Sequence, residues 1–201
     1  MLESLAGWLT RGMIRTGSVP PEDEDIYVYG WSLILAEAGN VLTMLLIGLL
    51  SGEFIGTLIF LFTFIILRIY AGGFHADSFG ACYIFSVLLY AAALLLYKFI
   101  PVAWESLALV VMLALSALIT YIWSPVDHPN KPQNAAQKAK NKKISSLIIT
   151  LEIICVLLIW LWQPNSMPYL LWAALGSLTT SLTLFYLIIR PYGSANASIN
   201  S

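Results

Sequence analysis

A histidine and a cysteine, His75 and Cys82, lie seven residues apart in a chain that contains only two residues of each type. A thiol attacks as its thiolate, and at neutral pH it needs a nearby base or a lowered pKa. Histidine is the usual base, because its pKa lies close to working pH. The pair therefore indicates a cysteine nucleophile with a histidine base. On composition alone, an inert buried cysteine is the commoner interpretation.

The spacing of the pair restricts the backbone between the two residues. On one continuous helix, seven residues would place both side chains on the same face but about 10.5 Å apart, which is too far for proton transfer. We therefore expect the helix to be interrupted between His75 and Cys82. Three glycines supply the backbone freedom that an interruption needs: Gly72, Gly73 and Gly80.

A new helix is expected to begin after this interruption, capped by Asp77 or Ser78. Cys82 would then lie near the N-terminal turn of that helix, where the positive end of the helix dipole stabilises a thiolate. Backbone amides of the Gly72-Gly73 turn, or of the new helix start, would be available to bind an oxyanion.

The composition shows what kind of scaffold must position these residues. The chain of 201 residues is 59% hydrophobic and only 10% charged, whereas a soluble domain has about 25% charged residues. Its apolar residues form long blocks, as a bilayer-spanning helix requires. Its net charge of −1 provides no general attraction for nucleic acid, and Cys82 and Cys155 suggest no disulfide framework. The predicted fold class is all-α, in a polytopic membrane protein.

Six apolar blocks predict six transmembrane helices, separated by breaks that carry turn residues or charge. The blocks cover approximately residues 31–50, 54–70, 81–99, 102–123, 147–162 and 169–189. Aromatic residues lie near several of their ends, as is typical of the membrane interface. Residues 31–190 thus form the predicted transmembrane domain, and residues 191–201 a predicted disordered tail.

The basic residues predict the orientation of these helices. With six spans, both termini lie on one side, and that side holds nine of the ten Lys and Arg residues, with only Lys98 on the other. The positive-inside rule therefore predicts that both termini are cytoplasmic. We interpret the basic stretch 131–143 mainly as a determinant of this topology beside anionic lipid.

Residues 1–30 form a predicted cytoplasmic segment with an amphipathic helix on the membrane surface. Apolar side chains recur there at helical spacing: Leu2, Leu5, Leu9 and Met13. The acidic run of residues 22–25 is interpreted as a solvated linker.

A few ionisable side chains lie within or beside the predicted spans on the cytoplasmic side. Such residues are expensive in a bilayer and often functional. They are Glu37, Arg68, His75, Asp77, Cys82 and Glu152. Together they can line one polar cavity that is open to the cytosol. For Glu37 and Glu152, a role as a hydrogen-bonding link between helices fits equally well.

The segment from Arg68 to Cys82 resembles the accessory gene regulator B family of bacterial membrane peptidases. The family's pattern has an arginine, a small-residue turn, His-Ala, a serine, and a cysteine seven residues after the histidine. The chain matches it at Arg68, Gly72, Gly73, His75, Ala76, Ser78 and Cys82. Residues 124–132 look like the family's loop between helices four and five, which contains proline and Asn-Lys-Pro. The length, the six spans and the N-terminal helix also fit.

The resemblance implies a cysteine endopeptidase of the bacterial cell membrane that acts in quorum sensing, with its active site on the cytoplasmic side. The implied substrate is a small propeptide with a membrane-binding leader, a core containing an internal Cys or Ser, and an acidic C-terminal tail. Cys82 would attack the carbonyl at the end of the core, with His75 as base, and form a thioester. The internal nucleophile would then close a thiolactone or lactone ring. The resemblance also suggests a homodimer.

The identity of a third catalytic residue stays open among Asp77, Asp127 and Glu37, and Asp77 fits helix capping equally well. Further supporting roles are assigned to Ser78, Gly73 and Arg68, with anchoring of the helix end slightly favoured for the arginine.

No cofactor is expected, and two histidines more than fifty residues apart show no zinc-ligand spacing. The expected partners are the propeptide and the lipid bilayer, and nucleic acid is not among them. The alternative function is a non-enzymatic transporter or exporter of a small peptide, because six helices around a cytoplasmic polar cavity also permit transport.

Overall fold

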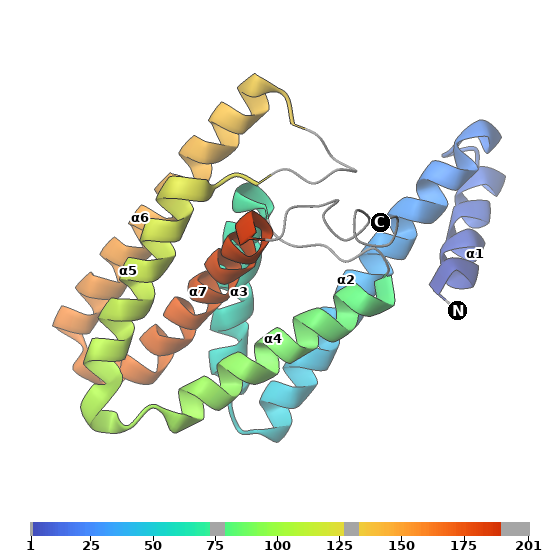
Figure 1. The fold of residues 1–201 in the computed structure, drawn as a ribbon. Helices are drawn as coiled ribbons and strands as arrows, with labels where there is room; N and C mark the ends of the chain where they lie inside the picture. The colour runs from blue at the N-terminus through green and yellow to red at the C-terminus, as the bar shows by residue number, and fades with distance from the viewer. Residues whose placement is uncertain (1, 73–78, 127–132, 190–201) are drawn as a thin grey trace, which may run out of the picture. The chain divides into compact units, whose positions relative to one another are not determined.

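The fold is all helical in the part of the chain that the structure, a computed structural model, describes: residues 2–72, 79–126 and 133–189 (Figure 1). The α-helices are α1 (Leu2–Arg15), α2 (Glu24–Leu50), α3 (Phe54–Ala71), α4 (Phe79–Phe99), α5 (Glu105–Trp123), α6 (Ala135–Trp162) and α7 (Met167–Ile189). Short 3-10 turns, Pro21–Asp23, Val102–Trp104 and Pro164–Ser166, lead directly into α2, α5 and α7. The predicted all-α fold is confirmed.

Six of these helices, α2 to α7, are long and apolar enough to cross a membrane, as predicted. Two of them begin well before the apolar block that identified them. Helix α2 begins at Glu24 and α6 begins at Ala135. The α6 extension starts with a capping box, in which Asn134 accepts from the Gln137 N–H and Gln137 accepts from the Asn134 N–H. The hydropathy of the sequence identifies only the apolar part of a helix that lipid covers. The helix itself continues into the neighbouring polar residues, because its backbone hydrogen bonds do not depend on apolar side chains.

Contacts divide the chain into two compact units. The first unit contains the described residues of Met1–Ile47 and Ala76–Tyr90, and the second those of Gly48–His75 and Ala91–Ser201. The first unit therefore holds α1, most of α2 and the first half of α4. The second unit holds α3, α5, α6, α7 and the end of α4.

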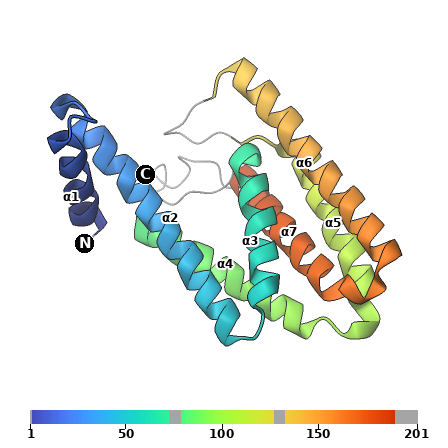
Figure 2. The ribbon, with the colours of Figure 1, turned by 180° about the vertical axis from the view of Figure 1, so that it is seen from behind.

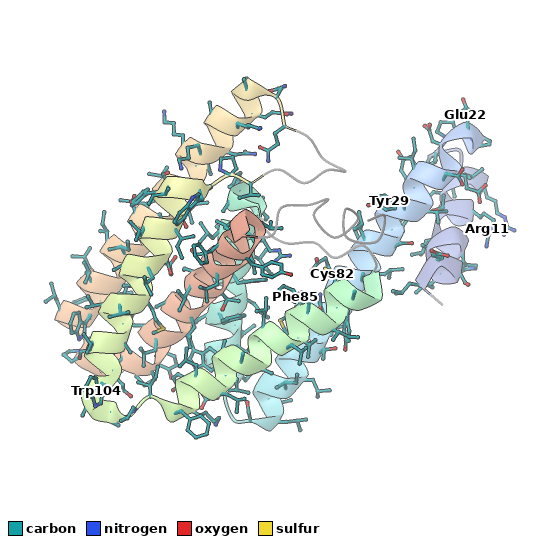
Figure 3. The ribbon with its side chains drawn as sticks, in the orientation of Figure 1. Arg11, Glu22, Tyr29, Cys82, Phe85 and Trp104 are labelled. Atoms are coloured by element: carbon teal, nitrogen blue, oxygen red, sulfur yellow. The ribbon has the colours of Figure 1, made fainter. Side chains whose placement is uncertain are left out.

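In the first unit, α1 runs beside the beginning of α2 (Figures 2 and 3). Arg11 Nη1 lies 3.7 Å from Glu24 Oε1, and the Trp31 indole N–H donates to Met13 Sδ at 3.4 Å. The residues that α1 buries are small: Ala6, Gly7 and Thr10. The predicted helix within residues 1–30 is thus present, and it contacts α2 through Arg11 and Met13.

The apolar residues that identified α1 are all partly or largely exposed. Leu2 is 40% exposed, Leu5 is 46% exposed, and Leu9 and Met13 are half-buried. An exposed apolar face suits a helix at a membrane surface, so the interfacial location stays a prediction that this arrangement supports.

In the second unit, α7 is the central helix. It packs against α3 and α5, and α6 packs against α3 and α5 in turn. Hydroxyl side chains of α7 are buried in these contacts: Thr180 donates to Phe64 O at 3.1 Å, and Ser181 donates to Ser116 O at 3.2 Å. A Cβ placed on Gly176 would lie 2.6 Å from Phe60 O. Small and hydroxyl residues therefore allow close helix approach, as is common in membranes.

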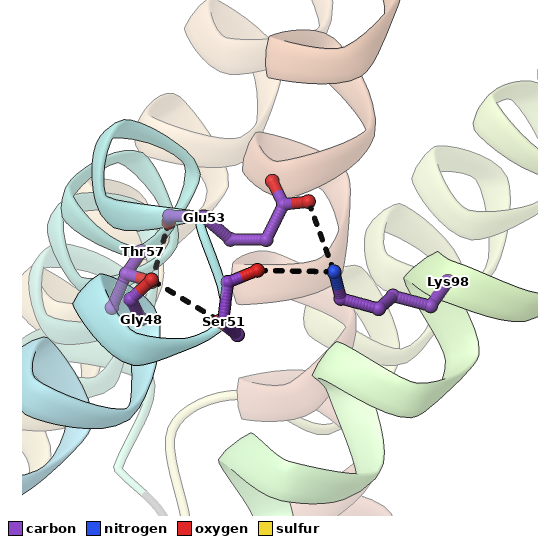
Figure 4. Close-up of polar contacts among 5 residues, drawn as sticks. All are labelled: Gly48, Ser51, Glu53, Thr57 and Lys98. Atoms are coloured by element: carbon purple, nitrogen blue, oxygen red, sulfur yellow. Dashed lines mark hydrogen bonds and ion pairs between the residues drawn. The ribbon is translucent and has the colours of Figure 1, made fainter.

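The turn between α2 and α3 is held to the end of α4 by one lysine (Figure 4). Lys98 Nζ lies 3.4 Å from Glu53 Oε1 and donates to Ser51 O at 3.2 Å. Gly52, at the tip of the turn, has a φ of 79°, a conformation that favours glycine. Lys98, the one basic residue predicted on the non-cytoplasmic side, thus links two segments of the second unit.

Candidate functional site

Cys82 lies close to the start of α4 (Figure 3). Helix α3 ends at Ala71, Gly72 has a φ of 81°, and α4 begins at Phe79, which makes Cys82 its fourth residue. Helix α3 thus ends before His75, and residues 73–78 lie outside the described residues, so the interruption expected between His75 and Cys82 stays a prediction. The thiol is free and half-buried. The first turn of a helix has unpaired N–H groups and the positive end of the dipole, so this position favours a thiolate.

The neighbour of Cys82 ties α4 to α2 within the first unit. Thr43 Oγ1 and Tyr83 OH lie 2.8 Å apart, and Thr43 Oγ1 also donates to Gly39 O at 2.9 Å. Because the threonine hydroxyl has one proton, Tyr83 is the donor in the contact between the helices. The start of α4 is thus attached to the middle of α2 one residue after the thiol.

Asn40 and Glu37 lie on α2 before this contact. Asn40 is buried, and sequence analysis did not identify it. The signal was present, because Asn40 and Thr43 are polar residues three apart in an apolar block. Glu37 is exposed and makes no hydrogen bond or ion pair with any described residue. The helix-linking role considered for Glu37 therefore has no contact to support it in the described ranges.

At the end of α3, the two segments that carry the family resemblance touch. The Val126 N–H donates to Ala71 O at 3.1 Å. A Cβ on Gly72 would lie 2.5 Å from Val126 O, so glycine is needed there for both its conformation and the close approach. We call this contact the Gly72–Val126 contact. Along the chain, His75 follows Gly72 by three residues, and Asp127 directly follows Val126.

The loop side of the Gly72–Val126 contact is held by α6. Ser124 Oγ and Ser145 Oγ are 2.7 Å apart and buried. Lys142 Nζ donates to Tyr121 O at 2.6 Å, at the C-terminal end of α5, where a cation interacts favourably with the dipole. Val126 also packs against a buried apolar cluster: Leu67, Ala71, Ile119, Ile149 and Leu184. Lys142, which belongs to the basic stretch 131–143, therefore caps the C-terminal end of α5.

Arg68 lies in the last turn of α3, half-buried. Its guanidinium carbon lies 5.2 Å from the centroid of the Phe64 ring, a distance that suits a cation–π interaction. Its carbonyl accepts from the Gly72 N–H at 3.0 Å. These contacts support the interpretation of Arg68 as an anchor of the helix end.

Glu152, on α6, contacts α7 in the interior of the second unit. Ser177 Oγ donates to the Glu152 carboxyl group, with 2.5 Å between Ser177 Oγ and Glu152 Oε2. This contact supports the interpretation of Glu152 as a link between helices. Glu152 belongs to the second unit and Cys82 to the first.

Five of the candidate site residues named from the sequence lie outside the described residues, and so does Ala76 of the family pattern; the five are His75, Gly73, Asp77, Ser78 and Asp127. Their roles stay predictions. Among the residues that are described, no three His, Cys, Asp or Glu side chains are placed to hold a metal ion.

Comparison with known proteins identifies relatives along nearly the whole chain. The family model described as Accessory gene regulator B matches residues 3–187. Two AgrB-like proteins of Clostridium perfringens are 29% identical over 168 residues (79% of this chain, 78% of the relative) and 27% identical over 198 residues (93% and 92%). The accessory gene regulator protein B of Staphylococcus aureus is 27% identical over 155 residues (77% and 79%). No solved structure matches the chain significantly.

Proposed function

The chain belongs to the accessory gene regulator B family, and from this premise we propose that it is a membrane-embedded cysteine endopeptidase. Its proposed substrate is a small quorum-sensing propeptide, from which it removes the C-terminal tail before closing the core into a ring. The observation that carries the proposal is the place of Cys82, in the first turns of a helix that begins at Phe79. The histidine of the family pattern lies seven residues earlier.

In the first step, His75 removes the proton of the Cys82 thiol, and the thiolate attacks the carbonyl carbon at the end of the core. The tetrahedral intermediate collapses and the C–N bond breaks. The amine of the tail leaves with the proton that His75 had taken. The core remains bound to Cys82 as a thioester, and His75 is neutral again.

In the second step, the internal Cys or Ser of the core attacks the thioester. His75 takes the proton of this nucleophile and returns it to Cys82 as the C–S bond to the enzyme breaks. The products are a thiolactone or lactone and the free thiol. Atoms and charges balance without an oxidant or a cofactor.

The environment at the start of α4 supports the first step. A thiolate near a helix N-terminus is stabilised by the unpaired amides and by the dipole, which lowers the free energy of the reactive form. The same amides are candidate donors to the oxyanion of the tetrahedral intermediate. The bond between Thr43 and Tyr83 ties this end of α4 to α2, which limits movement of the nucleophile.

A site within a membrane protein suits the second step. Water would hydrolyse the thioester, so limited access of water protects the intermediate. Holding the internal nucleophile beside the thioester supplies a high effective concentration. We place this site on the cytoplasmic side, with both termini in the cytoplasm, because nine of the ten basic residues favour that orientation. A homodimer in the lipid bilayer is the proposed assembly.

The test uses the purified protein in lipid vesicles with its propeptide, followed by mass spectrometry. Cys82→Ala and His75→Ala are each expected to abolish cleavage, and wild type is expected to show a covalent adduct at Cys82. The chain offers matched controls, since its other cysteine and histidine are Cys155 and His128. Cys155→Ala and His128→Ala are expected to cleave like wild type.

Cleavage that survives Cys82→Ala would contradict the peptidase proposal. Movement of the peptide across the vesicle membrane by Cys82→Ala, without cleavage by any variant, would favour the transporter alternative.

A further inference from the structure

Within the first unit, Cys82 lies beside the middle of α2 (Figure 3). The contact that fixes its level is the hydrogen bond between Thr43 and Tyr83, the residue after Cys82, with 2.8 Å between the two hydroxyl oxygens. Long side chains on a helix point back toward its N-terminus. Helices α2 and α4 are the first and third predicted spans, so both are predicted to run away from the cytoplasm. The backbone of Tyr83 therefore lies level with Thr43 or deeper, and Cys82 is its neighbour.

Thr43 lies well inside the apolar part of α2. It follows Glu37, the last charged residue of this helix, by six residues, and it precedes Leu50, where α2 ends, by seven. These separations are about 9 Å and 10.5 Å along the helix axis. Measured from Trp31, at the predicted interface, the separation is about 18 Å, and a tilt of 40° leaves about 14 Å. A hydrocarbon core about 30 Å thick therefore contains Thr43, whether Trp31 or Glu37 lies at its boundary.

The side chains around this level are apolar and exposed. Leu42, next to Thr43, is 66% exposed, and Ile84 and Leu88 on α4 are 58% and 62% exposed. The first nineteen residues of α4 carry no charge. Surfaces that face water rarely expose large apolar patches, so these faces of the two helices suit lipid. The exposure of these side chains is independent of the hydrogen bond between Thr43 and Tyr83, and it indicates the same depth.

We propose that the Cys82 thiol lies inside the hydrocarbon region of the bilayer, so that the peptide bond to be cleaved has to enter this region. This inference rests on the proposed function. Backbone N–H and C=O groups need partners in lipid, so the protein has to pair those of the substrate around the scissile bond. The cytoplasmic side is then the side from which the substrate enters, and the chemistry takes place deeper in the bilayer.

The depth is measured by electron paramagnetic resonance on protein in lipid vesicles, with a nitroxide label on the native Cys82 of the Cys155→Ala variant. Oxygen concentrates in the hydrocarbon, whereas a neutral nickel chelate stays in water, so the ratio of their collision rates with the label reports depth. Two reference labels use Leu42→Cys and Glu22→Cys, each in a background that also carries Cys82→Ala and Cys155→Ala. The oxygen-to-nickel ratio at Cys82 is expected to equal that at Leu42 and to exceed that at Glu22.

A label on the half-buried Cys82 can disturb the fold, so Ile84→Cys is labelled in parallel in the background without native cysteines. Ile84 lies two residues after Cys82 and is exposed, and the same high ratio is expected there. A ratio equal to that at Glu22, at Cys82 or at Ile84 in a folded protein, would overturn the inference. Failure of the proposed function is visible separately, because the labels are measured without substrate: wild type would then form no thioester at Cys82, whatever the depth of the thiol.

Discussion

Replacing Gly72 by alanine tests whether the Gly72–Val126 contact is important for the fold and for processing. Gly72 has φ 81° and ψ −162°, a region that is essentially restricted to glycine, and a side chain there raises the free energy by about 1–3 kcal/mol. The new Cβ would also lie 2.5 Å from Val126 O. Relief of that overlap requires the loop to move and the hydrogen bond from Val126 N–H to Ala71 O to lengthen.

Loss of this hydrogen bond adds about 1 kcal/mol, so the total destabilisation is expected to be about 2–4 kcal/mol. For a chain of about this size, each kcal/mol lowers the melting temperature by about 2–4 °C. We therefore expect Gly72→Ala to melt about 5–15 °C below wild type in detergent, followed by intrinsic tryptophan fluorescence. Cleavage of the propeptide should fall as well, because the altered segment leads to His75.

Gly52 provides a matched control. It also has a positive φ, 79°, but a Cβ there meets nothing within 4 Å. Gly52→Ala should therefore show only conformational strain of about 1–2 kcal/mol and should keep wild-type cleavage per folded molecule. Equal melting temperatures for the two alanine variants would refute the reasoning, because the contact with Val126 would then contribute nothing.

Two further contacts lead to predictions about stability. Lys142→Met should lower the free energy of unfolding by about 1 kcal/mol, because α5 loses the cation that binds the Tyr121 carbonyl. Lys140, like Lys142, lies on α6 but is exposed, so Lys140→Met should melt like wild type. A similar loss of stability in both variants would contradict the capping role of Lys142. Ser177→Ala should lower the melting temperature in proportion to about 1–3 kcal/mol, since it leaves the carboxyl group of Glu152 without its donor. The double variant with Glu152→Leu should recover part of that loss, and a thermal scan in which the two changes add would contradict the pairing.

The family resemblance and the break before Cys82 were both accessible from local sequence. The break followed from helix geometry, since seven residues of continuous helix would separate a histidine from a cysteine by about 10.5 Å. Helix α3 ends at Ala71 and α4 begins at Phe79, but residues 73–78 lie outside the described part of the chain, so the location of the break stays a prediction. The roles of His75 and of the third catalytic residue remain predictions from the family pattern.

Several interpretations left open by the sequence depended on partners that lie far away along the chain. Glu152 fitted a cavity and a link between helices equally well, and its bond to Ser177 supports the link. Lys142 was one of several basic residues until its contact with Tyr121 O distinguished it. Asn40 was not identified at all, because an asparagine in an apolar block becomes informative only when its burial is known.

The sequence by itself determined that this chain forms helices able to span a membrane, and how many there are. These properties depend on local quantities: the hydrophobicity of a block of residues, and backbone groups that must be satisfied within the segment in lipid. Only the tertiary structure decided that α7 is the central helix of its unit, that α1 contacts α2 through Arg11 and Met13, and that Gly72 meets Val126. Lipid solvates all apolar side chains alike, so the choice of helix partners depends on close packing and hydrogen bonds between distant segments.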